Sequence, residues 1–260
     1  MNYWQGALLG LVQGLTEFLP VSSSGHLVLA EAIAGVEPPG VFVEVVLHVA
    51  TLGSVFIVYG RRLWDLAVGL FRRSPDRIRY IGLLAVASIP AAVIGVFFQK
   101  AIEARFHSLP WLGIEFIATG FILWSTRGSG GEKTEPGWGT SLGIGVGQAV
   151  AILPAISRSG ATVAAALWAG LTPAAAAEFS FLLSVPVIAG AALLEARDAT
   201  VNIATVGLGP LIVSFVLAFV SGVYAIRFLV ALLRRGRFYS FAPYCWAVGL
   251  LTLVWALWQG

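Results

Sequence analysis

The sequence predicts an all-α integral membrane protein, and three observations support this fold class. Hydrophobic residues make up 58% of the 260 residues and only 11% are charged, whereas about a quarter of the residues of a soluble domain are charged. The mean hydropathy is +0.88. Six segments are apolar over the roughly 20 residues that a helix needs to cross a bilayer. They lie at residues 41–60, 78–98, 109–125, 174–195, 203–225 and 241–258.

Four further apolar segments are too short or too interrupted to span a bilayer. Residues 3–19 and 26–36 flank Pro20, and residues 137–153 and 160–171 flank Pro154. Proline removes a backbone donor and ends a helix. We therefore predict two pairs of short re-entrant helices, each of which enters and leaves the membrane on the same side.

Basic residues are concentrated in two loops, which indicates the orientation of the chain. Residues 61–79 hold six arginines against two aspartates, and residues 227–237 hold four arginines and no acid. Such clusters stay on the cytoplasmic side of a membrane. With both loops inside, the first short pair enters from outside and the second from the cytoplasm. The net charge of +3 is thus explained by membrane anchoring, and no nucleic-acid partner is expected.

The two short pairs also share a sequence pattern. Gln13, Ser22, Ser24 and Gly25 recur at one constant offset as Gln148, Ser157, Ser159 and Gly160. We therefore predict a single membrane domain, residues 1–260, built from two inverted-topology repeats. The repeats are residues 1–127 and 137–260, and a flexible polar linker at 128–136 joins them. Inverted repeats bring broken helices together near the bilayer midplane, where such proteins bind polar ligands.

The first break, residues 13–26, places several polar groups inside an apolar segment. Gln13 and Glu17 are four residues apart and share one helix face. Three serines and His26 follow Pro20. A charged group within the membrane costs about 2.5–3.5 kcal/mol on insertion scales, so it normally serves a site. The serines alternatively cap the next helix. Oxygens of Glu17 and Gln13 suit a divalent cation, Mg²⁺ or Ca²⁺.

The second break contains Ser157, Arg158, Ser159 and Thr162. A guanidinium at a helix start, beside hydroxyls and free backbone N–H groups, suits an oxyanion such as phosphate. The alternative is an ion pair of Arg158 with Glu17 or Glu178, and both roles are compatible. Together the two breaks predict a site for phosphoryl transfer, in which positioning and charge neutralisation supply most of the catalysis.

Other polar residues in the apolar segments carry less weight. Glu44 and Glu178 each open a predicted span and either reach the site or cap the helix. His48 is assigned to core packing, and Glu115 to the membrane interface.

In its two breaks the chain resembles the undecaprenyl-diphosphate phosphatases of the bacitracin-resistance type. One family motif is Glu or Gln, three residues, Glu, then Phe-Leu-Pro-Val-Ser-Ser and Gly-His, and it occurs at residues 13–26. The other, Pro-Gly-x-Ser-Arg-Ser-Gly-x-Thr, occurs at residues 154–162 with Ala155 in place of the usual glycine. The resemblance covers the whole chain. It implies hydrolysis of a C55 isoprenyl diphosphate to the monophosphate and inorganic phosphate, outside the bacterial cytoplasmic membrane, which recycles the carrier lipid of cell-wall synthesis and gives bacitracin resistance.

The resemblance also implies roles for individual residues. Ser23 is the expected nucleophile and His26 the acid–base group, although His26 alternatively attacks while Ser23 binds phosphate. Gln13 and Glu17 are expected to position a metal ion or water, and Gln13 stands where a second carboxylate is possible. Phosphate binding is expected at Ser22, Ser157, Arg158, Ser159 and Thr162.

Two rival functions share features of this sequence. The acid-phosphatase type of lipid phosphatase needs a histidine after its Ser-Arg pair, and no histidine follows Arg158. A transporter or flippase for an anionic lipid or solute shares the predicted architecture. His26 and the serine cluster favour the enzyme, because a passive anion site has no need of them. The expected partners are the isoprenyl diphosphate and the bilayer, and both a monomer and a homodimer are compatible with the sequence.

Overall fold

The computed structural model describes residues 1–34, 41–103, 106, 108–198 and 206–259. In these ranges the regular structure is helical, apart from one isolated β-bridge between Lys133 and Leu171. The helices are α1 (Tyr3–Phe18), α2 (Ser23–Ala34), α3 (Val41–Phe71), α4 (Pro75–Glu103), α5 (Leu109–Trp124), α6 (Trp138–Val150), α7 (Arg158–Trp168), α8 (Pro173–Asp198), α10 (Leu208–Arg234) and α11 (Ala242–Gln259), with a 3₁₀ helix at Phe238–Phe241. The all-α prediction is confirmed.

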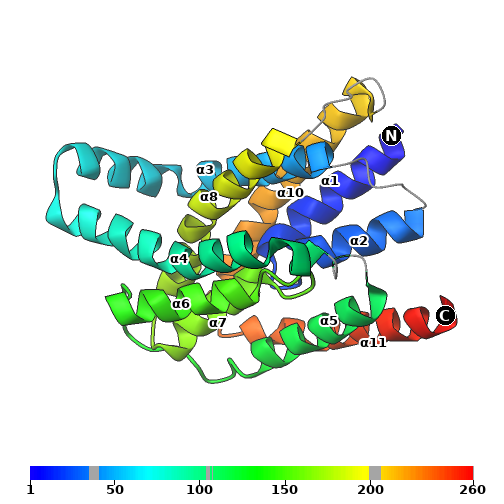
Figure 1. The fold of residues 1–260 in the computed structure, drawn as a ribbon. Coiled ribbons are helices and arrows are strands. Elements are labelled where there is room, and N and C mark those ends of the chain that lie inside the picture. The colour runs from blue at the N-terminus through cyan, green and yellow to red at the C-terminus, as the bar shows by residue number, and fades with distance from the viewer. Residues whose placement is uncertain (35–40, 104–105, 107, 199–205, 260) are drawn as a thin grey trace.

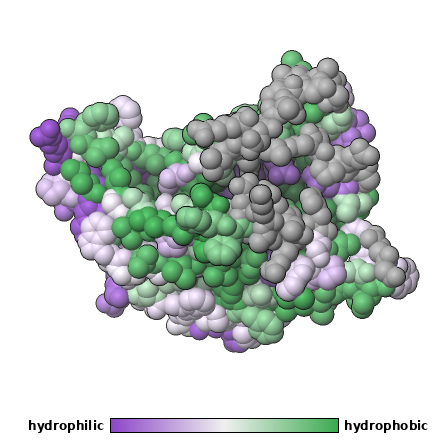
Figure 2. Space-filling model, in the orientation of Figure 1, coloured by the Kyte–Doolittle hydropathy of each residue, from purple (hydrophilic) through white to green (hydrophobic). Residues whose placement is uncertain are grey.

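Five helices are long and apolar enough to cross a membrane, namely α3, α4, α8, α10 and α11. They coincide with five of the six predicted spans. The remaining predicted span, residues 109–125, forms α5, an apolar helix of only 16 residues, which is shorter than the roughly 20 residues that a span needs. Large apolar side chains are exposed along these helices, and Figure 2 shows them as broad green areas of the surface.

The predicted basic loops are mostly helical. α3 continues to Phe71 and α4 begins at Pro75, so only residues 72–74 form the turn between them. In the same way, α10 continues to Arg234. Hydropathy marks only the part of a helix that lies in lipid, whereas arginine is a good helix former in water. The α3–α4 hairpin therefore projects from the body of the molecule (Figure 1).

Glycines allow several helices to pack closely. α1 packs against α10 and α6 against α4, while α3 packs on α8 and α5 on α11. A side chain at Gly10 of α1 would collide with the carbonyl oxygen of Ser214 in α10. At Gly145 of α6, an added Cβ would lie 2.5 Å from the carbonyl oxygen of Ala87 in α4. Small residues at membrane helix interfaces permit this approach, which increases van der Waals contact.

The four short helices form at the predicted positions and make two hairpins, α1–α2 and α6–α7. The hairpins reach toward each other from opposite sides of the molecule, and their turns meet near its centre (Figure 1). Two hydrogen bonds join the turns. Ser22 Oγ donates to the carbonyl of Pro154 at 2.6 Å, and Ser159 Oγ donates to that of Leu19 at 3.1 Å. The two breaks therefore form one structural unit.

The linker is anchored rather than flexible, which corrects the prediction from its composition. The Lys133 amide donates to the carbonyl of Gly170, and the Lys133 carbonyl accepts from the amide of Thr172. Arg79 also donates to Glu135 at 3.1 Å. Glycine-rich composition indicates an unconstrained chain in isolation, and it contains no information about backbone partners from the α7–α8 turn.

Candidate functional site

A cavity of about 220 Å³ lies where the two turns meet. Its walls come from the α1–α2 and α6–α7 hairpins and from α3, α4 and α8. The lining residues are Thr16, Glu17, Ser22, Ser23, Ser24, His48, Ala91, Gln148, Ala151, Ile152, Leu153, Pro154, Ile156, Ser157, Arg158, Val187, Ile188 and Ala191. The cavity thus has one polar end, built by the two breaks, and an apolar flank.

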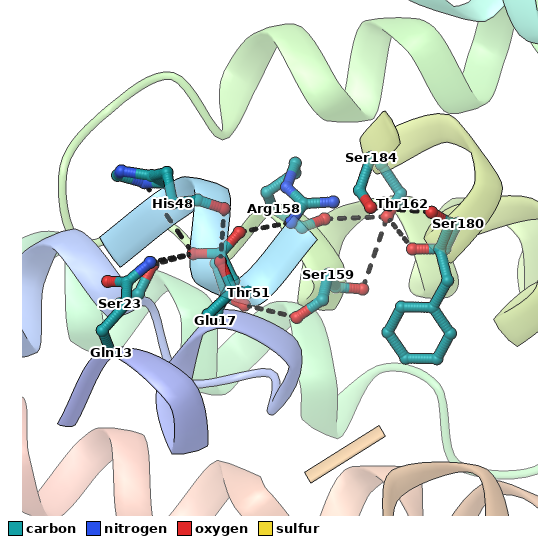
Figure 3. Close-up of polar contacts among 12 residues, drawn as sticks. Gln13, Glu17, Ser23, His48, Thr51, Arg158, Ser159, Thr162, Ser180 and Ser184 are labelled. Carbon is teal, nitrogen blue, oxygen red and sulfur yellow. Dashed lines mark hydrogen bonds and ion pairs between the residues drawn. The ribbon is translucent and has the colours of Figure 1, made fainter. Parts of the chain in front are cut away.

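Glu17 is the centre of the polar end, and its side chain is buried. Ser23 Oγ donates to Glu17 Oε2 at 2.6 Å, and Gln13 Nε2 donates to the same oxygen at 3.1 Å. Arg158 Nη2 donates to Oε1 at 2.6 Å (Figure 3). A buried carboxylate is stable only when it is paired and hydrogen-bonded, and these contacts meet that condition. The ion-pair alternative for Arg158 is therefore realised with Glu17.

Arg158 still has a free donor. The residue opens α7, and Ser157 caps the helix by accepting a hydrogen bond from the Gly160 amide at 3.1 Å. Nη2 binds Glu17, but Nη1 is buried and has no hydrogen-bond partner among the described residues. An unsatisfied buried donor costs about 1–3 kcal/mol. An oxyanion that enters the cavity would remove this cost, so the site can pair a guanidinium with Glu17 and with a phosphate at once.

His48 lines the cavity, so its assignment to core packing was wrong. Its Nδ1 lies 2.8 Å from the carbonyl oxygen of Glu44. A carbonyl only accepts, so Nδ1 carries the hydrogen and, in the neutral ring, Nε2 presents a lone pair. Nε2 is 4.0 Å from Glu17 Oε2. The sequence showed a histidine one turn after Glu44 but gave no sign of the cavity, because α3 is remote in sequence from both breaks.

His26 lies outside the cavity lining. Its Nδ1 is 2.7 Å from the carbonyl oxygen of Ser22, and its Nε2 is 2.8 Å from the hydroxyl of Tyr244 in α11. The ring stacks on Tyr244 at an interplanar angle of 7° and meets the Phe116 ring edge-on. Because the carbonyl must accept from Nδ1, Nε2 accepts from the tyrosine hydroxyl. Both ring nitrogens are thus engaged by protein partners.

The hydroxyls of the breaks divide into two groups. Ser22, Ser23, Ser24 and Ser157 line the cavity. Ser22 adopts φ 70°, a strained conformation for a residue other than glycine, and such strain is common at functional sites. Ser159 and Thr162 lie outside the lining and stabilise the turns.

Thr162 connects α7 to its neighbours through its hydroxyl. Its Oγ1 donates to the Arg158 carbonyl at 2.8 Å or shares a hydrogen bond with Ser180 Oγ at 2.7 Å (Figure 3). Ser159 Oγ is 3.2 Å from Ser157 Oγ and donates to Leu19. The structure therefore supplies these two hydroxyls with protein partners, whereas the Arg158 guanidinium still has a donor to offer.

Two acids serve the framework, the buried Glu115 and the partly exposed Glu178. Glu115 Oε2 accepts from the Ala155 amide at 2.8 Å, so it supports the second turn, and its assignment to the interface was wrong. Glu178 accepts from Arg62 Nε at 2.9 Å and lies outside the cavity lining. The carbonyl of Glu44 orients His48, as described above.

The polar end fits a protein-held metal ion poorly. No group of three His, Cys, Asp or Glu residues suited to a metal occurs within the described ranges. The groups in hydrogen-bond contact with Glu17 are donors, and one is a cation. Gln13 offers one oxygen, the buried and unpartnered Oε1. Ca²⁺ takes six to eight oxygen ligands and Mg²⁺ requires a near-octahedral set, so most ligands would have to come from elsewhere.

Residues 6–251 match the model of a protein family described as bacitracin resistance protein BacA. The chain belongs to this family. It is similar to proteins named undecaprenyl-diphosphatase from several bacteria. The relative from Desulforapulum autotrophicum is 42% identical over 98% of each chain. That from Carboxydothermus hydrogenoformans is 41% identical over 98% of this chain and 97% of its own. The Bacteroides fragilis relative is 37% identical over 98% of each.

Membership of the BacA family confirms the resemblance seen in the two sequence motifs. In this BacA-family chain, the motifs form the two turns that meet at the cavity.

Proposed function

We propose that this protein hydrolyses undecaprenyl diphosphate to undecaprenyl phosphate and inorganic phosphate, and so recycles the carrier lipid of cell-wall synthesis. The observation that carries the proposal is the meeting of Ser23, Glu17 and Arg158 in one cavity, with Arg158 Nη1 unpartnered. The names of the relatives support the substrate, and the family description connects the activity with bacitracin resistance.

In the proposed reaction, Ser23 Oγ attacks the terminal phosphorus of the diphosphate. Its proton passes to Glu17 Oε2, to which it is already hydrogen-bonded at 2.6 Å. The bond between the terminal phosphorus and the bridging oxygen breaks, and the lipid monophosphate leaves. Arg158 neutralises charge on the transferred group, because preorganised donors stabilise phosphoryl transfer in a site that excludes water.

Water then hydrolyses the phosphoserine. The hydroxyl of the water bonds to phosphorus, the Ser23 oxygen leaves and regains the proton held by Glu17, and the second water proton departs with inorganic phosphate. We assign the orientation of this water to His48, whose Nε2 faces the cavity. Direct attack by His26 is less compatible with the geometry, because both of its ring nitrogens are engaged beside Tyr244.

We propose further that α5 crosses the membrane as a sixth span and that residues 1–127 and 137–260 are inverted-topology repeats. Reciprocal packing supports this arrangement, since α1 packs on α10 as α6 packs on α4. At the α5–α11 crossing, a Cβ added to Gly113 would lie 2.9 Å from the Gly249 carbonyl oxygen, and one added to Gly249 would lie 2.7 Å from that of Gly113. A pseudo-two-fold axis through this crossing explains the symmetry.

We place the protein in the bacterial cytoplasmic membrane, with the cavity toward the outer side. The arginine-rich ends of α3, α4 and α10 belong inside by their charge. His48 lies seven positions after Val41, at the opposite end of α3 from Arg61. Val187 and Ala191 likewise lie toward the end of α8 that is remote from Glu178 and its arginine partner. The lining thus comes from the outer parts of these helices.

A divalent cation remains part of the proposal as a companion of the diphosphate. Mg²⁺ and Ca²⁺ take oxygen ligands, which the substrate supplies in excess. Glu17 lines the cavity, and Gln13, which is hydrogen-bonded to it, has an unpartnered Oε1, so these two residues would supply the protein oxygens. Activity that is lost on chelation and restored by Mg²⁺ or Ca²⁺ would support this role, and full activity in chelator would contradict it.

The deciding experiment measures phosphate release from undecaprenyl diphosphate by the purified protein in detergent. Wild type should release phosphate, and Ser23→Ala and Glu17→Gln should not. With label in the terminal phosphate, quenching during turnover should leave the label on Ser23. Label on His26 would refute the assigned nucleophile. Absence of release from folded wild type, with and without Mg²⁺ or Ca²⁺, would overturn the enzyme and favour a transporter or flippase.

A further inference from the structure

An apolar groove of about 450 Å³ runs between α4 and α6. It is lined by Pro90, Val93 and Ile94 of α4 and by Val146, Ala149 and Val150 of α6. Every lining residue is apolar, which distinguishes the groove from the cavity with its polar end. The proposed reaction, which concerns only the diphosphate, makes no use of it.

The groove adjoins the cavity along one shared wall. Ala91 and Gln148 line the cavity, and each is next in sequence to a groove residue, Pro90 and Ala149. On a helix, residues three apart lie on the same face. Ile94 of the groove is therefore beside Ala91 of the cavity. The groove and the cavity therefore lie on either side of the same part of the α4–α6 contact.

The groove also faces outward toward lipid. Val93 is 47% exposed and Val146 is 53% exposed, and α4 is among the helices apolar enough to cross a membrane. Figure 2 shows hydrophobic residues gathered over the region where α4 and α6 run in Figure 1. An occupant of the groove would therefore be in contact with the bilayer on one side and with the α4–α6 wall of the cavity on the other.

We infer that the α4–α6 groove binds the isoprenyl tail of the lipid diphosphate next to its headgroup. This inference rests on the proposed function, because Arg158 and Glu17 would hold the diphosphate. A tail joined to a bound headgroup occupies the adjoining groove at high effective concentration, whereas a free membrane lipid has no such anchor. Burial of the tail adds roughly 0.8 kcal/mol per methylene only where it leaves water, so the groove contributes most to a substrate drawn from water or from a loose micelle.

The first test fills the groove by Val146→Trp. The matched control is Val216→Trp on α10, where the valine is 48% exposed and remote from both spaces. Two substrates are compared in detergent, undecaprenyl diphosphate and the tail-less methyl diphosphate. The groove-filling change should raise KM for the long-chain substrate roughly tenfold, equivalent to about two buried methylenes. It should leave kcat/KM for methyl diphosphate unchanged, and the control should affect neither substrate.

Equal effects of the two tryptophans, or equal effects on the two substrates, would overturn the inference.

The second test needs no variant and decides the case if Val146→Trp fails to fold. A non-hydrolysable isoprenyl diphosphate with a photoreactive group on the isoprene unit nearest the phosphates is crosslinked to the wild-type protein. Label on residues 90–94 and 146–150 is expected. Label on residues 187–191 of α8, or scattered label, would refute the groove. A protein that cleaves neither substrate would instead refute the proposed function, while the crosslink still reports the site of the tail.

Discussion

Replacement of Arg158 by lysine should remove most of the activity while keeping the charge. The guanidinium uses Nη2 to bind Glu17 at 2.6 Å and keeps Nη1 for the phosphate. Lysine offers one ammonium on a flexible stem, without the planar fork that serves two oxyanions together. It must therefore bind either Glu17 or the phosphate. Loss of one donor to the developing charge costs about 2.7–4 kcal/mol, so kcat should fall about 10²–10³-fold.

The assay is phosphate release from undecaprenyl diphosphate by wild type and Arg158→Lys, with thermal unfolding of both proteins as a check on folding. The matched control is Arg127→Lys, since Arg127 stacks on Trp124 and Tyr239 away from the cavity. The control should keep its activity. If folded Arg158→Lys retained kcat/KM within about threefold of wild type, less than 1 kcal/mol of transition-state stabilisation would have been lost, and the two-oxyanion role of Arg158 would be wrong.

Two further predictions concern the framework around the site. Gly10→Ala should lower the free energy of unfolding by about 1–3 kcal/mol, and with it the unfolding temperature. The reason is that the new methyl collides with the Ser214 carbonyl and overpacks the α1–α10 contact. Gly143→Ala, which adds a methyl with nothing within 4 Å, should leave the temperature unchanged, and equal unfolding curves for the two variants would contradict the role of close packing. Glu178→Gln should keep kcat/KM within about threefold of wild type, because Glu178 pairs with Arg62 outside the cavity. If kcat/KM fell as far as in Glu17→Gln, Glu178 would belong to the site.

Much of the architecture could be predicted because it depends on local composition. Long apolar runs identified five helices, and Pro20 and Pro154 marked the turns of the two hairpins. Polar residues in an apolar segment are costly, so their presence alone pointed to Glu17 and Arg158. These signals are short-range, and a sequence records them directly. Helix ends were less predictable, because α3 and α10 continue as helices beyond the apolar segment.

The roles within each break depended on the tertiary structure. Ser23 and His26 are three residues apart on α2, yet only Ser23 reaches Glu17, because His26 is held against Tyr244 by hydrogen bonding and stacking. His48 enters the cavity from α3, remote in sequence from both motifs.

Composition and local pattern thus determined that this is a helical membrane protein with two polar breaks, one that carries the acid Glu17 and one that carries the basic Arg158. They could do so because hydropathy and proline act within one segment of chain. Packing between distant helices decided which side chains of those breaks share a cavity. Arg158 reaches Glu17 where hydrogen bonds of Ser22 and Ser159 join the two turns, and the linker is anchored by backbone hydrogen bonds to the α7–α8 turn. Such contacts depend on the direction in which each side chain points once the helices have docked, which the sequence of either segment alone does not contain.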